Sequence, residues 1–295
     1  MDAAPMGKVQ ALLILIKHRI LVTILFTGFT GMIMTVGPWP AFSTTMLCFA
    51  ILILGAGGAA MANNVLDQEI DSQMPRTQKR LKALESLGAS RAAFLAATML
   101  LGSVVIAFLT MNLYFQVSLW LAIFSYVIIY TLFLKRGGPF GTILGGLPGA
   151  LPALMGSYAF SESFHSDVWL LFTFMMLWQP AHFWALALKM EPDYRSAGIP
   201  VLSVVYGPEY TKLFIYIYAL PLLPVSLAIF HFGSYGIVYG ISAIALGVYY
   251  LLATVAGLKS PAGYGRAFAA SLYYLVGIML ALNLDLISRY LSATL

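Results

Sequence analysis

Residues 44–80 read TTMLCFAILILGAGGAAMANNVLDQEIDSQMPRTQKR, an apolar run that ends in a cluster of polar side chains. Charged residues make up only 9% of the chain, yet residues 63–80 hold three carboxylates, three cations and two asparagines. An apolar run of about 20 residues can cross the hydrocarbon core of a bilayer. The stretch therefore predicts a membrane-spanning helix with a polar site at its end.

The acidic part of this cluster repeats with a helical period. Asn63, Asp67 and Asp71 follow one another at intervals of four residues. On a helix they would share one face, each about 6 Å beyond the last. Together with Asn64 they offer hard oxygen donors, which Mg²⁺ prefers, and Mg²⁺ usually binds together with substrate phosphates. We therefore expect a metal–diphosphate site at a membrane edge. Glu69 is off the ladder and is expected to be solvated or to contact the metal ligands from outside.

The basic part of the cluster supplies groups that can bind phosphate oxygens. Arg76 and Arg80 are one helical turn apart, and Lys79 lies between them. Guanidinium and ammonium groups donate charge-assisted hydrogen bonds to phosphate. The alternative is a solvated loop with ordinary anchoring cations, but a regular ladder of acids beside arginines is uncommon at a membrane edge.

Composition places the rest of the chain in the membrane. Of the 295 residues, 61% are hydrophobic, and the mean hydropathy is +0.88. A soluble domain of this length would carry far more charge. We expect one polytopic domain over residues 1–295, without a cleavable signal or an organelle presequence. Hydrophobic runs predict nine spans, at residues 19–37, 44–64, 92–111, 115–134, 140–160, 167–188, 212–231, 234–257 and 267–288.

The cations orient these spans. If the loops alternate between sides, all of the 16 Lys and Arg residues except Arg289 fall on one side. The positive-inside rule then predicts a cytoplasmic N-terminus and an outside C-terminus. It also accounts for the formal charge of +5 without nucleic acid as a partner. The two long loops, at residues 65–91 and 189–211, are both predicted to be cytoplasmic, and we expect function to concentrate there.

The second long loop carries its own acid. Asp193 lies in the segment KMEPDYRSAGIP, which begins at Lys189. Because Pro192 is expected to end the preceding span, we predict a loop here and not a helical ladder. Asp193 would face the first acidic cluster, and the two acidic patches could hold two Mg²⁺ ions across one diphosphate.

The quoted stretch also resembles a known motif. NNVLDQEIDSQMPRT at 63–77 is similar to the NDxxDxxxD motif of the intramembrane UbiA-type prenyltransferases, and its Asn-Asn opening resembles the heme O synthase branch of that family. Three further segments resemble that branch: YTLFLKRGGPFGTILGGLPGALPALMGS at 130–157, LWQPAHFWALAL at 177–188 and DYRSAGIPVLSVVYG at 193–207. The second acidic motif keeps only Asp193 of the paired aspartates that are usual in the family. The resemblance implies an all-α bundle of nine transmembrane helices with a cytoplasm-facing central cavity.

This resemblance implies a prenyl transfer. Farnesyl diphosphate would lose its diphosphate, and the farnesyl group would join a vinyl group of heme B with addition of water, giving heme O. Heme B and farnesyl diphosphate would be the substrates, and Mg²⁺ the cofactor. The implied location is a bacterial inner membrane with the active site toward the cytoplasm. A heme A synthase or a terminal oxidase assembly would be candidate partners.

The resemblance also assigns roles to individual residues. The metal ligands would be Asn63, Asp67, Asp71 and Asp193. The catalytic groups would be Asp67, Asp71, Asp193, Arg76 and Arg80. The substrate-binding groups would be Asn63, Asn64, Lys79, Lys135, Arg136, His182 and Lys189. Preplaced cations would lower the barrier to breaking the C–O bond, because negative charge develops on the bridging oxygen.

His182 lies inside a predicted span, where ionisable groups are rare and usually functional. Neutral imidazole is a good iron ligand, so one interpretation is a contact to heme. The other is a histidine that is hydrogen-bonded to a neighbouring helix. Gly141, Gly145 and Gly149 similarly indicate either close helix packing or room for a flat porphyrin.

Two other functions fit parts of the pattern. A UbiA-type enzyme could attach a prenyl chain to a quinone precursor, but the Asn-Asn opening and the segment at 177–188 argue against it. A transporter could use intramembrane acids, although transporter sites usually lie near the midplane in broken helices. The predicted acids lie at the membrane edge beside arginines, which favours a diphosphate site.

Overall fold

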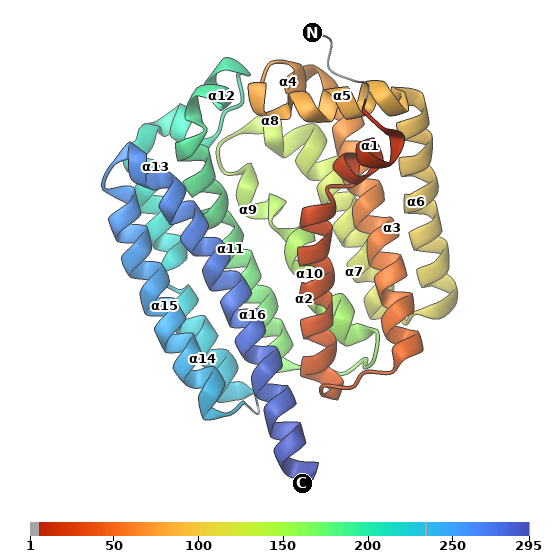
Figure 1. Ribbon diagram of the computed structural model, residues 1–295, viewed down its shortest axis with the longest axis vertical. Helices are drawn as coiled ribbons and strands as arrows, with labels where there is room; N and C mark the ends of the chain where they lie inside the picture. The colour runs from red at the N-terminus through yellow and green to blue at the C-terminus, as the bar shows by residue number, and fades with distance from the viewer. Residues whose placement is uncertain (1–5, 234, 295) are drawn as a thin grey trace.

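The computed structural model describes residues 6–233 and 235–294, and the regular structure in these two ranges is entirely helical (Figure 1). The helices are α1 (Lys8–Leu15), α2 (His18–Val36), α3 (Phe42–Leu66), α4 (Gln68–Ser72), α5 (Gln78–Leu87), α6 (Ala89–Thr110), α7 (Leu113–Ile123), α8 (Lys135–Gly137), α9 (Gly141–Gly145), α10 (Leu147–Tyr158), α11 (Ser166–Lys189), α12 (Glu191–Ser196), α13 (Leu202–Ala219), α14 (Leu222–Phe232), α15 (Ile237–Leu258) and α16 (Tyr264–Thr294). Short 3-10 turns are η1 (Pro75–Thr77) and η3 (Pro261–Gly263), and η2 (Phe124–Leu134) is π-helical. Residue 234, the first of one predicted span, lies outside the described ranges, as do residues 1–5 and 295 of the predicted domain.

Within the described residues, eight helical stretches are long and apolar enough to cross a membrane, and they coincide with eight of the predicted spans. The predicted span at 140–160 is instead divided, because α9 ends at Gly145 and α10 begins at Leu147. Pro148 stands in the first turn of α10, where its missing N–H is tolerated. The two short helices together run from the upper end of the bundle toward the lower (Figure 1).

Large apolar side chains cover the outside of the bundle. Leu101, Phe108 and Leu252 are 65%, 66% and 65% exposed. A contiguous apolar exterior is unfavourable in water and favourable in hydrocarbon. Together with the apolar helices, this exterior indicates a multi-pass membrane protein.

The helices form two groups that meet along a continuous core. In one group, α2 packs against α3 and α10, and α3 packs against α6. In the other group, α11 packs against α13, α14 and α16, and α15 packs against α16. Contacts of α11 with α10 and of α16 with α2 join the groups, and one buried cluster includes Met32, Trp178 and Tyr274 from both.

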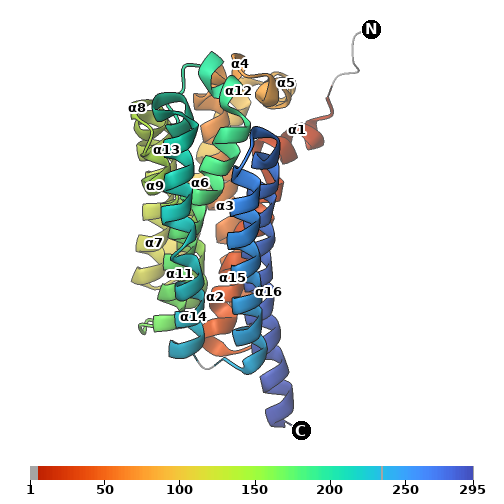
Figure 2. The ribbon, with the colours of Figure 1, turned by 90° about the vertical axis from the view of Figure 1, so that its left-hand side faces the viewer.

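The short helices gather at one end of the bundle. In both views α4, α5, α8 and α12 lie at the end where α1 lies, and the C-terminal part of α16 projects from the other end (Figures 1 and 2). The prediction of a loop around Asp193 was wrong, since residues Glu191–Ser196 form α12. Pro192 does not prevent this helix because it occupies the first turn, where a proline N–H is not needed.

The backbones of α2 and α10 touch. A Cβ added at Gly31 would lie closer than 3.0 Å to the carbonyl oxygen of Ala153, and one at Gly156 equally close to the carbonyl oxygen of Gly28. Contacts this close are possible only where the residue that faces the carbonyl group has no side chain, as in small-residue helix interfaces. The α2–α10 contact therefore depends on glycine at these positions.

The glycines singled out at 141–149 also lie against neighbours. A Cβ at Gly141 would meet the carbonyl of Leu134, one at Gly145 the ring of Tyr130, and one at Gly149 the amide of Gln179, each closer than 3.0 Å. Close packing accounts for all three glycines, and two of them, Gly145 and Gly149, also line a cavity.

Gly156→Ala should destabilise the protein, because the new methyl group would collide with the carbonyl of Gly28. Overpacking of this kind typically costs about 1–3 kcal/mol. Gly102→Ala in α6 is the matched control, since its methyl group would meet only Leu54, at 3.9 Å. Thermal unfolding in detergent should occur at a lower temperature for Gly156→Ala only. Equal unfolding temperatures for both variants would contradict the backbone contact.

Candidate active site

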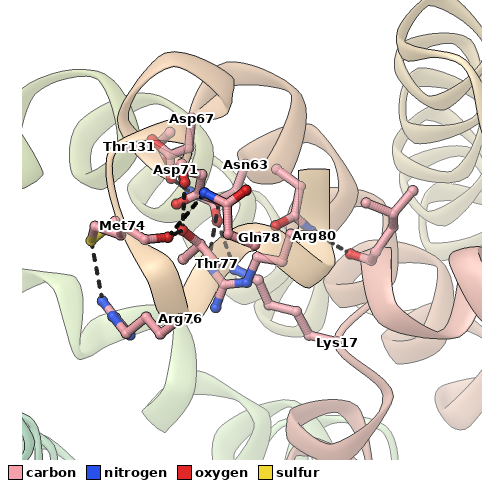
Figure 3. Close-up of polar contacts among 12 residues, drawn as sticks. Lys17, Asn63, Asp67, Asp71, Met74, Arg76, Thr77, Gln78, Arg80 and Thr131 are labelled. Atoms are coloured by element: carbon pink, nitrogen blue, oxygen red, sulfur yellow. Dashed lines mark hydrogen bonds and ion pairs between the residues drawn. The ribbon is translucent and has the colours of Figure 1, made fainter. Parts of the chain in front are cut away.

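The acidic ladder is present, although its helix is interrupted. α3 ends at Leu66, Asp67 follows with φ −91° and ψ 5°, and α4 begins at Gln68. Backbone hydrogen bonds continue across the break, since the N–H of Asp67 donates to the carbonyl of Asn63 at 2.9 Å and that of Asp71 to the carbonyl of Asp67 at 2.8 Å. Asn63, Asp67 and Asp71 thus follow one another along one side of the chain (Figure 3).

Both ladder carboxylates are buried and paired with cations. Asp67 and Asp71 are each 1% exposed. A buried carboxylate is strongly destabilising unless an opposite charge or hydrogen bonds compensate for its lost hydration. Lys135 Nζ lies 2.6 Å from Asp67 Oδ2, and Arg80 Nη1 lies 3.5 Å from Asp71 Oδ2. These two cations supply the compensation.

Asn63 links the ladder to the start of α2. Its Oδ1 accepts a hydrogen bond of 2.6 Å from Lys17 Nζ, and its Nδ2 donates to Asp67 Oδ2 at 2.7 Å and to Thr131 Oγ1 at 3.1 Å. Lys17 Nζ also donates to the hydroxyl of Tyr126 at 2.9 Å. Lys17 has a positive φ of 52°, which separates α1 from α2 at this point. In this arrangement the Asn63 oxygen binds an ammonium group.

The π-helical segment η2 presents its polar groups to the ladder. In a π-helix the backbone bonds run from residue i to i+5, so residues four or five apart lie on one face. Tyr126, Thr131 and Lys135 have this spacing, and all three side chains contact Lys17, Asn63 or Asp67. The wider winding therefore aligns three polar groups in an otherwise apolar span.

Asp193 joins the same site from α12. Its Oδ2 lies 4.0 Å from Arg76 Nε, and the Arg76 guanidinium lies over the ring of Tyr194, 4.7 Å from the ring centre. Tyr194 is buried beside Met74, and burial raises its pKa above the usual value, although Arg76 acts in the opposite direction. Asp193 thus meets Arg76, a cation that follows the first acidic patch in the sequence.

The remaining polar residues of the predicted site are placed differently. The Asn64 amide donates to the carbonyl of Leu15 at 2.7 Å, so it joins α3 to the end of α1. Lys79 and Arg136 are exposed at the same end of the bundle. The side chain of Lys189, the last residue of α11, lies beside Gly265 of α16.

His182 occupies a separate aromatic cluster between α11 and α16. Its ring stacks on Trp178 with the ring centres 4.4 Å apart and on Phe268 at 4.5 Å. Its Nδ1 lies 2.7 Å from Ser271 Oγ. His182 is therefore hydrogen-bonded to a neighbouring helix, α16. Its second ring nitrogen, Nε2, has no hydrogen-bond partner among the described residues.

An apolar cavity of about 210 Å³ adjoins the ladder. It is bounded by α2, α3, α7, α10, η2 and α11, by the end of α9 and by the link between α1 and α2. Its lining is apolar except for three side chains, Lys17, Tyr126 and Gln179. Two of these, Lys17 and Tyr126, also belong to the polar network at Asn63. The cavity and the carboxylates thus share a boundary.

The residues present fit a bound divalent cation. Oδ1 of Asp67 and Oδ1 of Asp71 are buried and have no hydrogen-bond partner. Unpaired buried carboxylate oxygens are unfavourable unless a cation or donor occupies the space beside them. In the described part of the chain no three His, Cys, Asp or Glu side chains form a ready ligand group, so a metal ion there would need other oxygens as well. Phosphate oxygens of a substrate would provide them.

Lys17, Tyr126 and Thr131 belong to the site but were not predicted from the sequence. The distance along the chain explains this, since Lys17 meets Asn63 across 46 residues and Tyr126 across 109. A usable signal was present in Thr131 and Lys135, two polar residues four apart at the end of an apolar span.

Curated relatives resemble the chain over most of its length. A protein from Geotalea uraniireducens named protoheme IX farnesyltransferase is 42% identical over 250 residues, which cover 85% of this chain and 96% of the relative. A protein of the same name from Marinobacter nauticus is 38% identical, over 92% of this chain and 90% of the relative.

Solved structures share the fold. A digeranylgeranylglyceryl phosphate synthase matches with a TM-score of 0.78 at 20% identity, over 96% of this chain and 100% of that one. A UbiA homologue from Archaeoglobus fulgidus, bound to DMAPP and Mg²⁺, matches with a TM-score of 0.68 at 13% identity, over 92% of this chain and 98% of that one. Residues 24–272 match the description "UbiA prenyltransferase family". With its fold, its acidic ladder and these relatives in agreement, the chain belongs to the UbiA prenyltransferase family.

Proposed function

We propose that this chain transfers the farnesyl group of farnesyl diphosphate to a vinyl group of heme B, giving heme O. One observation carries the diphosphate part: two buried carboxylates with unpaired oxygens lie among four cations, beside an apolar cavity. The four cations are Lys17, Arg76, Arg80 and Lys135. The choice of heme as acceptor is supported by the relatives named protoheme IX farnesyltransferase.

Asp67, Asp71, Asp193 and Asn63 would hold Mg²⁺ in this proposal. The Archaeoglobus homologue bound to DMAPP and Mg²⁺ supports a metal–diphosphate pair in this fold. When bound, Mg²⁺ supplies positive charge that stabilises the departing diphosphate. Asn63 would contribute its oxygen only if Lys17 moved away from it, because Lys17 now donates to that atom at 2.6 Å.

The cations of the site would contact the diphosphate. Lys135, Arg80 and Arg76 each pair with a different carboxylate in the structure. A phosphate oxygen that entered the cluster would find these donors already held in place. Donors that are oriented before the reaction stabilise developing negative charge without a cost of reorganisation. Lys79, Arg136 and Lys189, which are exposed, would contribute mainly long-range charge and attract the anion to this end.

The cavity would hold the farnesyl chain. Lys17 and Tyr126 stand at its boundary with the carboxylates, which suits a molecule with an apolar tail and a charged head. An allylic cation formed at that boundary would be trapped by water in an open site. Apolar walls, such as Gly55 and Ala59 of α3, would keep water out.

The bond changes balance with one water molecule. The bond between C1 of the farnesyl group and the diphosphate oxygen breaks, and C1 bonds to the terminal vinyl carbon of heme. A water oxygen bonds to the other vinyl carbon, and its released proton is taken up by diphosphate or solvent. His182 would contact the heme iron through Nε2, the ring nitrogen that has no partner in the described residues.

We place this reaction at the cytoplasmic side of a bacterial inner membrane. The cation-rich end of the bundle, which holds the ladder, would face the cytoplasm by the positive-inside rule. This orientation requires nine crossings, with α9 and α10 together forming the one that is divided. A heme A synthase or a terminal oxidase assembly would then receive the product.

Membranes that contain the protein should convert heme B and farnesyl diphosphate to a heavier, more hydrophobic heme, and EDTA should stop the conversion. Mass spectrometry of extracted hemes measures the product. Membranes without the protein are the control. If the heme profile is unchanged and a supplied quinone precursor becomes prenylated, the acceptor is an aromatic compound and not heme.

Asp67→Asn and Asp71→Asn should each lower turnover by more than about 100-fold, since each removes a buried carboxylate whose charge the mechanism uses. Glu69→Gln is the matched control, because Glu69 is an exposed acid between them. Initial rates, measured with equal amounts of folded protein, compare the turnover of the variants with that of the wild type. Full activity in both Asn variants would refute the assignment of these carboxylates.

Lys135→Met should lower turnover strongly, by about 100-fold, because it removes the ammonium group that pairs with Asp67 at 2.6 Å. Arg136→Met removes the adjacent exposed cation and should change turnover less than about threefold, since surface charges contribute little. Rates measured at saturating and at low farnesyl diphosphate would separate kcat from KM. Equal losses in both variants would indicate a general charge effect and not a specific contact.

A further inference from the structure

The hydrogen bonds around Ser271 fix the position of one proton. Ser271 Oγ lies 2.6 Å from the carbonyl oxygen of Phe268 and 2.7 Å from Nδ1 of His182. A carbonyl oxygen has no proton, so the hydroxyl must donate to it at that distance. A hydroxyl has only one proton to donate, and Ser271 Oγ must therefore accept from His182. His182 is then the tautomer that carries its proton on Nδ1.

The same bonds leave the other ring nitrogen with a lone pair. Nε2 of His182 has no hydrogen-bond partner among the described residues, and it is not fully buried. An accessible lone pair on neutral imidazole is what a metal requires from histidine. Histidine ligands usually donate their other N–H to a protein oxygen, which fixes the tautomer and the ring orientation.

Ser271 also fixes the aromatic rings that hold His182. Its carbonyl oxygen accepts a hydrogen bond of 2.8 Å from Trp178 Nε1, and Trp178 stacks on one face of the imidazole. Phe268 stacks on the other face. The imidazole can therefore neither tilt nor turn without breaking contacts to Ser271, to Trp178 or to Phe268.

The height of His182 in the bundle suits an acceptor of the proposed reaction. Gln179, which lines the cavity, lies three residues earlier on α11, and Asp193 follows in α12. At 1.5 Å per residue, His182 lies about 4.5 Å beyond Gln179 along the helix axis, toward the carboxylates. A group held at Nε2 would thus lie at a height between the cavity and the end of α11.

We propose that Ser271 is a positioning residue that keeps His182 in the Nδ1–H tautomer and so presents Nε2 to the iron of the acceptor heme. This inference rests on the proposed function, because it takes heme as the acceptor. Ser271 touches neither substrate in this arrangement. It acts through His182, by accepting one hydrogen bond.

The tautomer can be measured without any substrate. The chain has 4 histidines, so ¹⁵N-histidine labelling gives few signals, and His182→Ala identifies the one of interest. The wild type should show a protonated Nδ1 and an unprotonated Nε2. Ser271→Ala should shift His182 toward the other tautomer, and Ser271→Thr, which keeps the hydroxyl, should restore the wild-type pattern. A wild-type pattern in Ser271→Ala would overturn the inference.

Heme binding supplies the second measurement. Ferric heme B is titrated into purified wild type, Ser271→Ala, Ser271→Thr and His182→Ala, and the absorption and electron paramagnetic resonance spectra are recorded. Loss of a partner that orients a metal ligand typically lowers affinity about 10–100-fold, and we expect this for Ser271→Ala but not for Ser271→Thr. If Ser271→Ala does not fold, Ser271→Cys takes its place, because the thiol is close to the hydroxyl in size but accepts hydrogen bonds weakly. The loss of heme affinity expected for Ser271→Ala is then expected for Ser271→Cys.

The outcomes separate this inference from the proposed function. If His182→Ala binds heme with the wild-type spectrum, His182 is not the iron ligand and the proposed heme contact fails. If His182→Ala loses the ligand signal while Ser271→Ala keeps the wild-type affinity and spectrum, only the role of Ser271 fails. Affinity for farnesyl diphosphate should be unchanged in every folded variant, and a matching loss there would show a general structural effect and overturn the inference.

Discussion

The burial of two carboxylates governs the architecture of this protein at one end of the bundle. Asp67 and Asp71 are almost completely removed from solvent, and their charge is tolerated only with cations beside them. Those cations come from different elements, Lys135 from α8 and Arg80 from α5. Arg76 connects α12 to the same end of the bundle, because it forms an ion pair with Asp193. Charge compensation thus holds together three parts of the chain that are far apart in the sequence, namely residues 67–80, Lys135 and Asp193.

This arrangement also prepares the site for an anion. The ladder, its cations and the apolar cavity share Lys17 and Tyr126, so a charged head and an apolar tail can be bound side by side. The cations are already oriented by protein oxygens. An entering diphosphate would replace those oxygens as their partner, and little of the protein would need to be reordered. The aromatic cluster around His182 lies apart from this network, which is consistent with separate places for donor and acceptor.

Local sequence information predicted the parts that depend on local physics. Hydropathy located eight of the spans because the transfer of apolar side chains to lipid adds up residue by residue. The spacing of Asn63, Asp67 and Asp71 predicted their alignment because helical hydrogen bonds persist through the break at Asp67. The π-helical winding of η2 could not be predicted, since its apolar residues suit either helix. The contacts of Lys17 with Tyr126 and of His182 with Ser271 join residues far apart in the sequence, and the division at Gly146 depends on tertiary packing. The helix α12 was missed because a proline can end one helix and can equally stand in the first turn of the next, as Pro192 does.

The contact between α2 and α10 has a mechanical consequence for the cavity that both helices border. Where carbonyl groups lie against glycines of the facing helix, the two backbones can neither slide nor separate without losing that fit. The cavity therefore has one stiff wall. Its other side includes η2 and α9, through Tyr126 and Gly145, and there helical hydrogen bonding is irregular and the resistance to bending is lower. Any expansion that admits a long prenyl chain or releases a bulky product would thus be hinged on the α2–α10 seam and would open on the side of η2 and α9.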